Sequence, residues 1–183
     1  MSAKEPKRHF FETYGPFPIP IKNGLAIKPP ASWWKHLDED YGVEVSRAIG
    51  CYMFTMGRSR IKPWYIGKTV NRFDEETFQQ HRIDHYNKVI CDRKGPPGMY
   101  FFPLITRHFH EPKWRLASGA THDRLIRWLE KTLISMAHVR NRNLANKSDA
   151  TYLRTVDVRG LIGKGISGRA HGDISLAQRA LFD

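Results

Sequence analysis

The chain has 183 residues, enough for about one domain, and its 30 lysines and arginines against 18 aspartates and glutamates give a formal charge of +12. Such an excess attracts polyanions and favours nucleic acid over an anionic membrane surface as the partner. No apolar run approaches the ~20 residues that span a bilayer. The charged start lacks the apolar core of a signal peptide, so we expect a cytoplasmic protein without a membrane role.

Two cysteines, Cys51 and Cys91, are the only ones in the chain. They form no CxxC pair and offer no framework for structural zinc. Their number fits a reducing compartment, where they would be small core residues, and a single disulfide between them is the alternative.

Residues 1–48 are predicted to form an N-terminal arm followed by a helix. The arm up to residue 32 is rich in proline, which removes backbone donors and prevents a long helix. Aromatic residues between the prolines indicate that this extended arm packs against the rest of the protein. A short helix is expected between Ser32 and Ala48, before the first strand.

Residues 50–56 and 61–66 are predicted to pair as a β-hairpin. Both runs are rich in β-branched, aromatic and apolar residues, and residues 57–60 supply a turn between them. Pro63 cannot donate to a strand ladder, so we expect it at a bulge or on an unpaired side of its strand.

Helical spacing of apolar residues predicts a helix over residues 75–90 and a second long helix over about 121–140. Residues 99–106, which follow a loop rich in glycine and proline, are predicted to form a third strand. We expect Thr121 to cap the second helix and Asp123 to lie near its positive end. The apolar stripe of that helix is predicted to consist of Leu125, Leu129, Leu133 and Met136.

The tail over residues 151–183 is predicted to hold a short strand, a basic glycine-rich loop and a closing helix over 174–181. Residues 163–168 match the spelling of the dinucleotide fingerprint GxGxxG, but too little chain follows for the rest of that motif. A loop that follows a DNA backbone is the better interpretation. The expected DNA contacts are Arg159, Lys164 and Arg169 in this loop and Arg58 and Arg60 in the hairpin turn.

Two short motifs on the predicted hairpin carry a family resemblance. Gly50-Cys51-Tyr52 resembles the first motif of the GIY-YIG nuclease domain, with cysteine in place of the central isoleucine, and Tyr65-Ile66-Gly67 is identical to the second motif. The order of the predicted elements over residues 49–145 is similar as well. The resemblance implies an α/β fold: a small GIY-YIG domain over residues 49–150, with a central three-stranded antiparallel sheet flanked by helices, between the N-terminal arm and a basic C-terminal extension.

The resemblance also implies a set of catalytic residues. They are Tyr52, Tyr65, Lys68, Arg82, Tyr86, Glu130 and Asn143, with His85 as a second candidate for the position of Tyr86 and with Asn141 and Asn146 near enough to replace Asn143. In the implied mechanism, a metal ion on Glu130, Mg²⁺ or alternatively Mn²⁺, activates the phosphate. Tyr52 with Lys68 orients or deprotonates the attacking water, Arg82 with Tyr65 offsets charge in the transition state, and Asn143 fixes the geometry.

The residue types support these roles but leave structural alternatives open. Arg82 lies on an otherwise apolar helix face and needs an anionic partner, which is either a phosphate or a carboxylate of the protein. Glu130 has isoleucines one turn before and after it, so it should be partly buried and should find either a metal or a basic side chain. Lys68 beside two tyrosines is expected to lower the pKa of a phenol.

The function expected from the sequence is that of a metal-dependent endonuclease that hydrolyses phosphodiester bonds in double-stranded DNA. A small stand-alone enzyme such as a restriction endonuclease fits best, and cutting both strands would require a homodimer. The alternatives are a non-catalytic nucleic-acid-binding module on the same fold, or a GIY-YIG nuclease of repair or of mobile elements.

Overall fold

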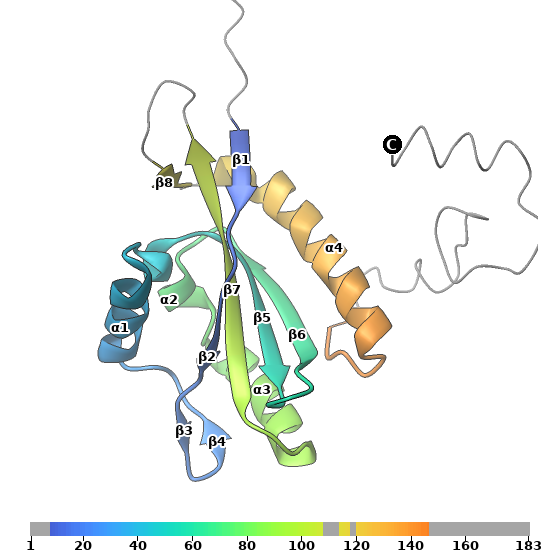
Figure 1. Cartoon of the computed structure of the whole chain (residues 1–183). Coiled ribbons are helices and arrows are strands. Elements are labelled where there is room, and N and C mark those ends of the chain that lie inside the picture. Colours follow the sequence, from blue (N-terminus) through green and yellow to red (C-terminus); the bar gives the residue numbers. More distant parts are fainter. Residues whose placement is uncertain (1–7, 108–113, 118–119, 147–183) are drawn as a thin grey trace, which may run out of the picture. The chain divides into compact units, whose positions relative to one another are not determined.

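The computed structural model describes residues 8–107, 114–117 and 120–146 (Figure 1). The predicted elements of the C-terminal tail lie outside the described residues. The same holds for the proposed DNA contacts of Arg159, Lys164 and Arg169.

Three antiparallel strands form the centre of the sheet, as predicted. They are β5 (Gly50–Met56), β6 (Lys62–Thr69) and β7 (Pro97–Arg107), with β5 in the middle. In this register Tyr52 lies opposite Gly67 on one side and Phe101 on the other. The two sequence motifs therefore lie side by side on neighbouring strands.

The sheet is larger than the predicted three strands because the N-terminal arm joins it. Strands β1 (Arg8–Phe11), β2 (Tyr14–Pro18) and β8 (Trp114–Leu116) all pair antiparallel with β7. The prolines of β2 are tolerated because this strand pairs only with β7. The arm is thus packed against the rest of the protein, as expected. It also contributes a separate small hairpin of β3 (Ile21–Lys22) and β4 (Leu25–Ala26).

Four α-helices accompany the sheet in the described part of the chain. The helix expected before the first strand is α1 (Ala31–Tyr41), which a 3₁₀ turn, η1 (Val45–Arg47), follows. The others are α2 (Phe73–Glu76), α3 (Gln80–Asp92) and α4 (Asp123–Arg140). None of the described helices is both long and apolar enough to cross a membrane.

The helix predicted over residues 75–90 is interrupted between α2 and α3. The carbonyl of Glu76 accepts a hydrogen bond from the Arg82 guanidinium, and that of Thr77 accepts one from the Tyr86 hydroxyl at 2.9 Å. Side chains therefore replace the backbone donors that a continuous helix would supply. The chain is extended at Gln79, and α3 starts there anew.

The start of the second long helix also differs from the prediction. A 3₁₀ turn, η2 (Ala120–His122), precedes α4, and His122 rather than Thr121 occupies the N-cap position, with no side-chain capping hydrogen bond. Asp123 does lie in the first turn, as expected. The apolar face is rotated toward Ile126 and Ile134, which are buried, while Met136 is 63% exposed.

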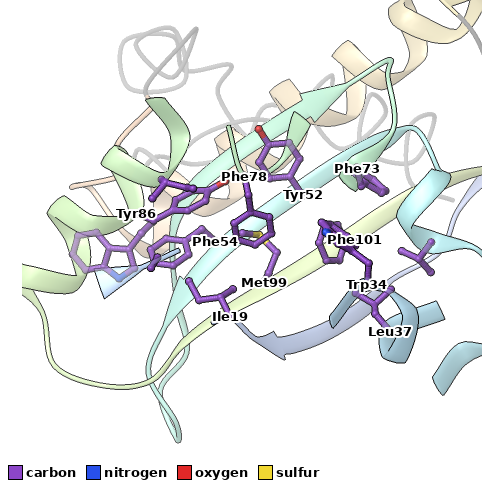
Figure 2. Packing of buried hydrophobic residues seen from close by; sticks show 14 of the residues in the cluster. Ile19, Trp34, Leu37, Tyr52, Phe54, Phe73, Phe78, Tyr86, Met99 and Phe101 are labelled. Carbon is purple, nitrogen blue, oxygen red and sulfur yellow. The ribbon is translucent and has the colours of Figure 1, made fainter. Parts of the chain in front are cut away.

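Buried side chains form two clusters, one on each face of the sheet. Tyr52, Phe54 and Phe101 pack with residues of α1, α2 and α3, and Figure 2 shows these aromatic side chains gathered with Phe73, Phe78 and Tyr86. On the opposite face, Cys51, Ile49 and Leu104 pack against Ile126 of α4. Both cysteines are free; Cys51 belongs to the core as expected, but Cys91 is exposed.

Strand β6 is the edge of the sheet, and the segment after α4 covers part of its outer side. Pro63 lies at a register shift between β5 and β6, as predicted for a bulge. The Asn141 amide donates to the Pro63 carbonyl at 2.7 Å, and the Ala145 backbone N–H donates to the Trp64 carbonyl at 2.8 Å. This part of the edge is therefore protected by hydrogen bonds.

Candidate active site

The candidate site lies around β6, the edge strand of the sheet, and includes side chains from both of its faces. Tyr52 of β5 and Tyr65 of β6 are on the face covered by α3, and their rings stack with centroids 6.2 Å apart and an interplanar angle of 24°. Lys68 lies opposite Cys51 in the register, and Cys51 is on the face covered by α4.

Close contacts explain why each motif has a glycine, Gly50 in the first and Gly67 in the second. A methyl group at position 67 would lie 2.3 Å from the Cζ atom of Tyr52, so only glycine leaves room for this ring. Gly50 has a φ of +152°, and a methyl group there would lie 2.2 Å from the Phe102 carbonyl oxygen. The central position of the first motif is a small core residue: the Cys51 thiol is buried and donates to the Ile126 carbonyl at 3.4 Å.

Tyr52 is fully buried, and its hydroxyl has no hydrogen-bond partner of good geometry among the described residues. The Arg82 guanidinium lies over the ring, with Cζ 5.4 Å from the ring centroid. Burial raises the pKa of the Tyr52 phenol well above its usual value, and Arg82 opposes this shift only in part. An unpartnered buried hydroxyl is a costly arrangement for stability, which is typical of functional sites.

Tyr65 and His85 form the more accessible part of this aromatic group. Tyr65 is half-buried, His85 is exposed, and their rings stack with centroids 5.8 Å apart. Burial raises the pKa of the Tyr65 phenol, with Arg82 acting in the opposite direction. The expectation that Lys68 lowers the pKa of a phenol is therefore wrong, because Lys68 pairs with a carboxylate instead.

Arg82 has the carboxylate partner that the sequence left as one alternative. Its guanidinium forms an ion pair with Glu76 at 3.1 Å, and the two side chains are only 13% and 20% exposed. The Glu76 carboxylate also accepts hydrogen bonds from the amides of Asn71 and Gln79. Arg82 is thus held in place beside Tyr52, and part of its guanidinium fork is left for a further anion.

Tyr86 and His85, the two candidates for one position of the implied catalytic set, differ in their surroundings. Tyr86 is completely buried, and its hydroxyl donates to the Thr77 carbonyl at 2.9 Å. His85 is exposed and stacks against Tyr65. The geometry therefore gives Tyr86 a structural hydrogen bond and leaves His85 accessible to a substrate.

Lys68 and Glu130 lie on the side of α4. The Lys68 ammonium pairs with Asp123 at 2.8 Å, and Arg127 pairs with the other carboxylate oxygen of Asp123 at 2.7 Å. These contacts lower the pKa of the Asp123 carboxyl, the hydrogen bond from Lys68 being the largest cause. Asp123 is consequently neutralised by two cations.

Glu130 is half-buried and makes no hydrogen bond or ion pair with another described residue. Burial raises the pKa of its carboxyl above the ordinary value of 4.5, and Lys68, Arg127 and Arg82 counteract this only in part. Glu130 in turn contributes to the raised pKa of Tyr65. The charge of Glu130 thus acts on Tyr65, and the charges of Lys68, Arg127 and Arg82 act on Glu130.

No protein-family model, curated protein or solved structure matches this chain.

Glu130 offers a single carboxylate to a metal ion. Within the described ranges no group of three or more histidine, cysteine, aspartate or glutamate side chains could hold a metal ion. A single carboxylate without a basic partner can still hold a hard cation when water and substrate oxygens complete the shell. Glu130 meets this condition, whereas Asp123 is already paired.

The asparagines after α4 hold the second motif rather than lining a pocket. The backbone N–H of Ile66 donates to the Asn146 side chain at 3.1 Å, and the Asn146 amide donates to the Ile66 carbonyl. Asn143 is exposed, and its backbone N–H donates to the Asn141 side chain at 3.0 Å. The side-chain contacts to the hairpin therefore come from Asn141 and Asn146.

Glu76 and Asp123 hold Arg82 and Lys68 in place, although neither is among the predicted site residues. Glu76 precedes Arg82 by six positions, which is not a helical spacing, and only the break before α3 brings the two together. The acidic residues 74–76 could have indicated a carboxylate near Arg82. Asp123 and Lys68 are on elements far apart in the chain, and no local pattern predicts their contact.

Proposed function

We propose that this protein is a metal-dependent DNA endonuclease of the GIY-YIG type. The observation that carries the proposal is the cluster of Tyr52, Tyr65 and Arg82 beside the edge strand, together with a Glu130 carboxyl on which the charges of Lys68 and Arg82 act. Metal-dependent hydrolysis of a phosphodiester needs a cationic side chain on the phosphate, a group that orients the attacking water and a carboxylate that binds the metal. This group of side chains offers all three, and the charge of +12 favours a polyanionic substrate.

Hydrolysis joins a water oxygen to phosphorus and releases a sugar oxygen, so the water must lose a proton and the leaving oxygen must gain negative charge or a proton. Glu130 would hold the divalent cation, Mg²⁺ or alternatively Mn²⁺, which supplies Lewis-acid activation of the phosphate when bound. Arg82 keeps guanidinium donors beyond those used by Glu76 and can place them on a phosphate oxygen.

The tyrosines act in their neutral forms in this proposal. Because burial raises the pKa of Tyr52 and of Tyr65, both phenols stay protonated at neutral pH. The half-buried Tyr65 orients water or a phosphate oxygen by a hydrogen bond, and the Tyr52 hydroxyl, which is buried in this structure, does so once DNA binding exposes it. The exposed imidazole of His85, stacked on Tyr65, is then the side chain best placed to accept the proton of the attacking water. Lys68, held by Asp123, adds positive charge near the carboxylate of Glu130.

Supercoiled plasmid and phage DNA, incubated with Mg²⁺, test the proposal. The wild-type protein should nick or cut at least one of these DNAs, while Glu130→Ala and Arg82→Ala should not. Glu39→Ala, which removes an exposed carboxylate on α1, is the matched control and should keep full activity. Cleavage of both strands, as in a cytoplasmic restriction endonuclease, would further require a homodimer.

The second candidate is a nucleic-acid-binding module without catalysis. The ion pair between Arg82 and Glu76 favours it, because a structural partner already satisfies the arginine. A wild-type protein that binds DNA with steep salt dependence but never nicks a broad set of DNAs would be such a module.

A further inference from the structure

Five cationic side chains gather at the end of the sheet where the β5–β6 turn lies. Arg58, Arg60 and Lys62 come from the turn and the first residue of β6, and Arg93 and Lys94 come from the loop before β7. All five are exposed. We call this set the turn patch.

The fold holds the two segments of the turn patch together. The backbone N–H of Gly57 donates to the Pro96 carbonyl at 3.0 Å. Gly95 comes so close that a methyl group on it would lie 3.0 Å from the Gly57 Cα atom. The Arg93 guanidinium also packs over the ring of Trp64, 5.0 Å from its centroid. The charges are therefore collected by tertiary structure rather than scattered.

The turn patch has almost no negative charge to balance it. Asp92 is the single carboxylate in the segments 57–63 and 91–96. Within the part of the chain that the structure describes, none of the five cations forms an ion pair. By contrast, Arg72, Arg82 and Arg127 each pair with a carboxylate. Unpaired cations on one surface are a suitable site for a polyanion.

We infer that the turn patch is a second phosphate-binding surface for duplex DNA, separate from the candidate active site; the inference rests on the proposed function. Lys62 precedes Tyr65 by three residues and Lys68 by six on β6, so at ~3.3 Å per residue the patch lies about 10–20 Å along the strand from the site. This span corresponds to roughly three to six base pairs of B-DNA at ~3.4 Å each. The patch would therefore hold the backbone on one flank of the cleaved bond.

A variant with Arg58, Arg60, Lys62 and Lys94 all replaced by glutamine tests the inference. Arg93 is left unchanged because it packs on Trp64. The matched control replaces Lys22, Lys28, Lys35 and Lys88, which are exposed elsewhere, and has the same net charge. Binding of a labelled random-sequence duplex to the full chain is measured in EDTA at several salt concentrations. Circular dichroism and thermal melting verify folding, and the double variant of Arg58 and Arg60 is used if the fourfold variant does not fold.

We expect the patch variant to bind DNA at least about tenfold more weakly, and its salt slope to fall by about 0.9 for each phosphate that it no longer neutralises. The control should stay close to wild type. Equal weakening of both variants would mean that net charge alone attracts DNA, and would overturn the inference. Unchanged DNA binding would overturn it too, and loss of binding to phosphatidylserine vesicles instead would point to a membrane surface.

The inference and the proposed function can fail independently. If the patch variant loses DNA affinity but the wild type cleaves no DNA with Mg²⁺, the turn patch stands and the nuclease proposal fails. If the wild type cleaves DNA but the patch variant binds and cleaves like the control, the nuclease proposal stands and the turn patch fails.

Discussion

Tyr52 and Gly67 lie opposite each other on β5 and β6, and the ring of Tyr52 occupies the space where any side chain at position 67 would begin. We predict that Gly67→Ala displaces this ring, because a methyl group 2.3 Å from Cζ must push it away. The free energy of unfolding should fall by about 1–3 kcal/mol, the usual cost of overpacking. Thermal melting and cleavage assays should show a less stable and less active protein.

Ser59→Ala in the exposed turn is the control for this variant and should melt like wild type. An alanine at position 67 that leaves both melting and cleavage unchanged would show that the ring position is not fixed by the glycine.

Tyr52 and Tyr86 should respond in opposite ways to loss of the hydroxyl. Tyr86→Phe leaves the buried Thr77 carbonyl without its donor and should cost about 1–3 kcal/mol while cleavage is retained. Tyr52→Phe removes a hydroxyl that makes no hydrogen bond of good geometry with the described residues, so stability should change little while cleavage is lost. Urea unfolding and plasmid nicking measure the two effects, and the reverse pattern would exchange the roles of the two tyrosines.

Replacement of Glu130 by glutamine should remove cleavage without destabilising the fold. Burial raises the folded-state pKa of Glu130 above 4.5, so its stability contribution is present below 4.5 and is lost as pH rises through the folded pKa. Glu130→Gln should therefore melt at the same or a higher temperature at pH 7, and its advantage should disappear in acid. Melting curves of the variant and the wild type, measured without metal from pH 7 into the acidic range, test whether the variant is the more stable protein at neutral pH and loses this advantage in acid. A strongly destabilised variant would indicate a structural ion pair instead.

Asp123 should show the opposite pH dependence. Its pKa is lowered below 3.8, so its contribution is present above 3.8 and is lost as pH falls through the folded pKa. Asp123→Asn should be less stable than wild type at neutral pH by less than about 1 kcal/mol, since the pairs with Lys68 and Arg127 are partly exposed. The difference should shrink in acid, as measured by urea unfolding. A difference that grows in acid would contradict the assigned pairing.

The hairpin could be predicted from the sequence because its signals are local. The two apolar runs, the turn between them and the proline that forces a bulge all act within neighbouring residues. The burial of Glu130 was also predictable, since it lies between Ile126 and Ile134 on α4.

What the sequence did not reveal depends on contacts between distant residues. The break before α3 arises because Arg82 and Tyr86 bind carbonyls that periodicity alone assigns to a continuous helix. The pairing of the N-terminal arm with β7 joins residues 95 positions apart, at Phe10 and Ile105. The partner of Lys68 was missed for the same reason, because Asp123 meets it only after α4 packs on the sheet.

Sequencing of DNA ends from a randomised duplex library tests the central claim most directly, because it does not depend on knowing the target site. The wild-type protein with Mg²⁺ should produce new ends that are absent with EDTA, with Glu130→Gln and with Tyr52→Phe. Equal numbers of new ends from the wild type and from both variants, or none from a wild-type protein that binds the library, would contradict the assignment of this site to phosphodiester hydrolysis.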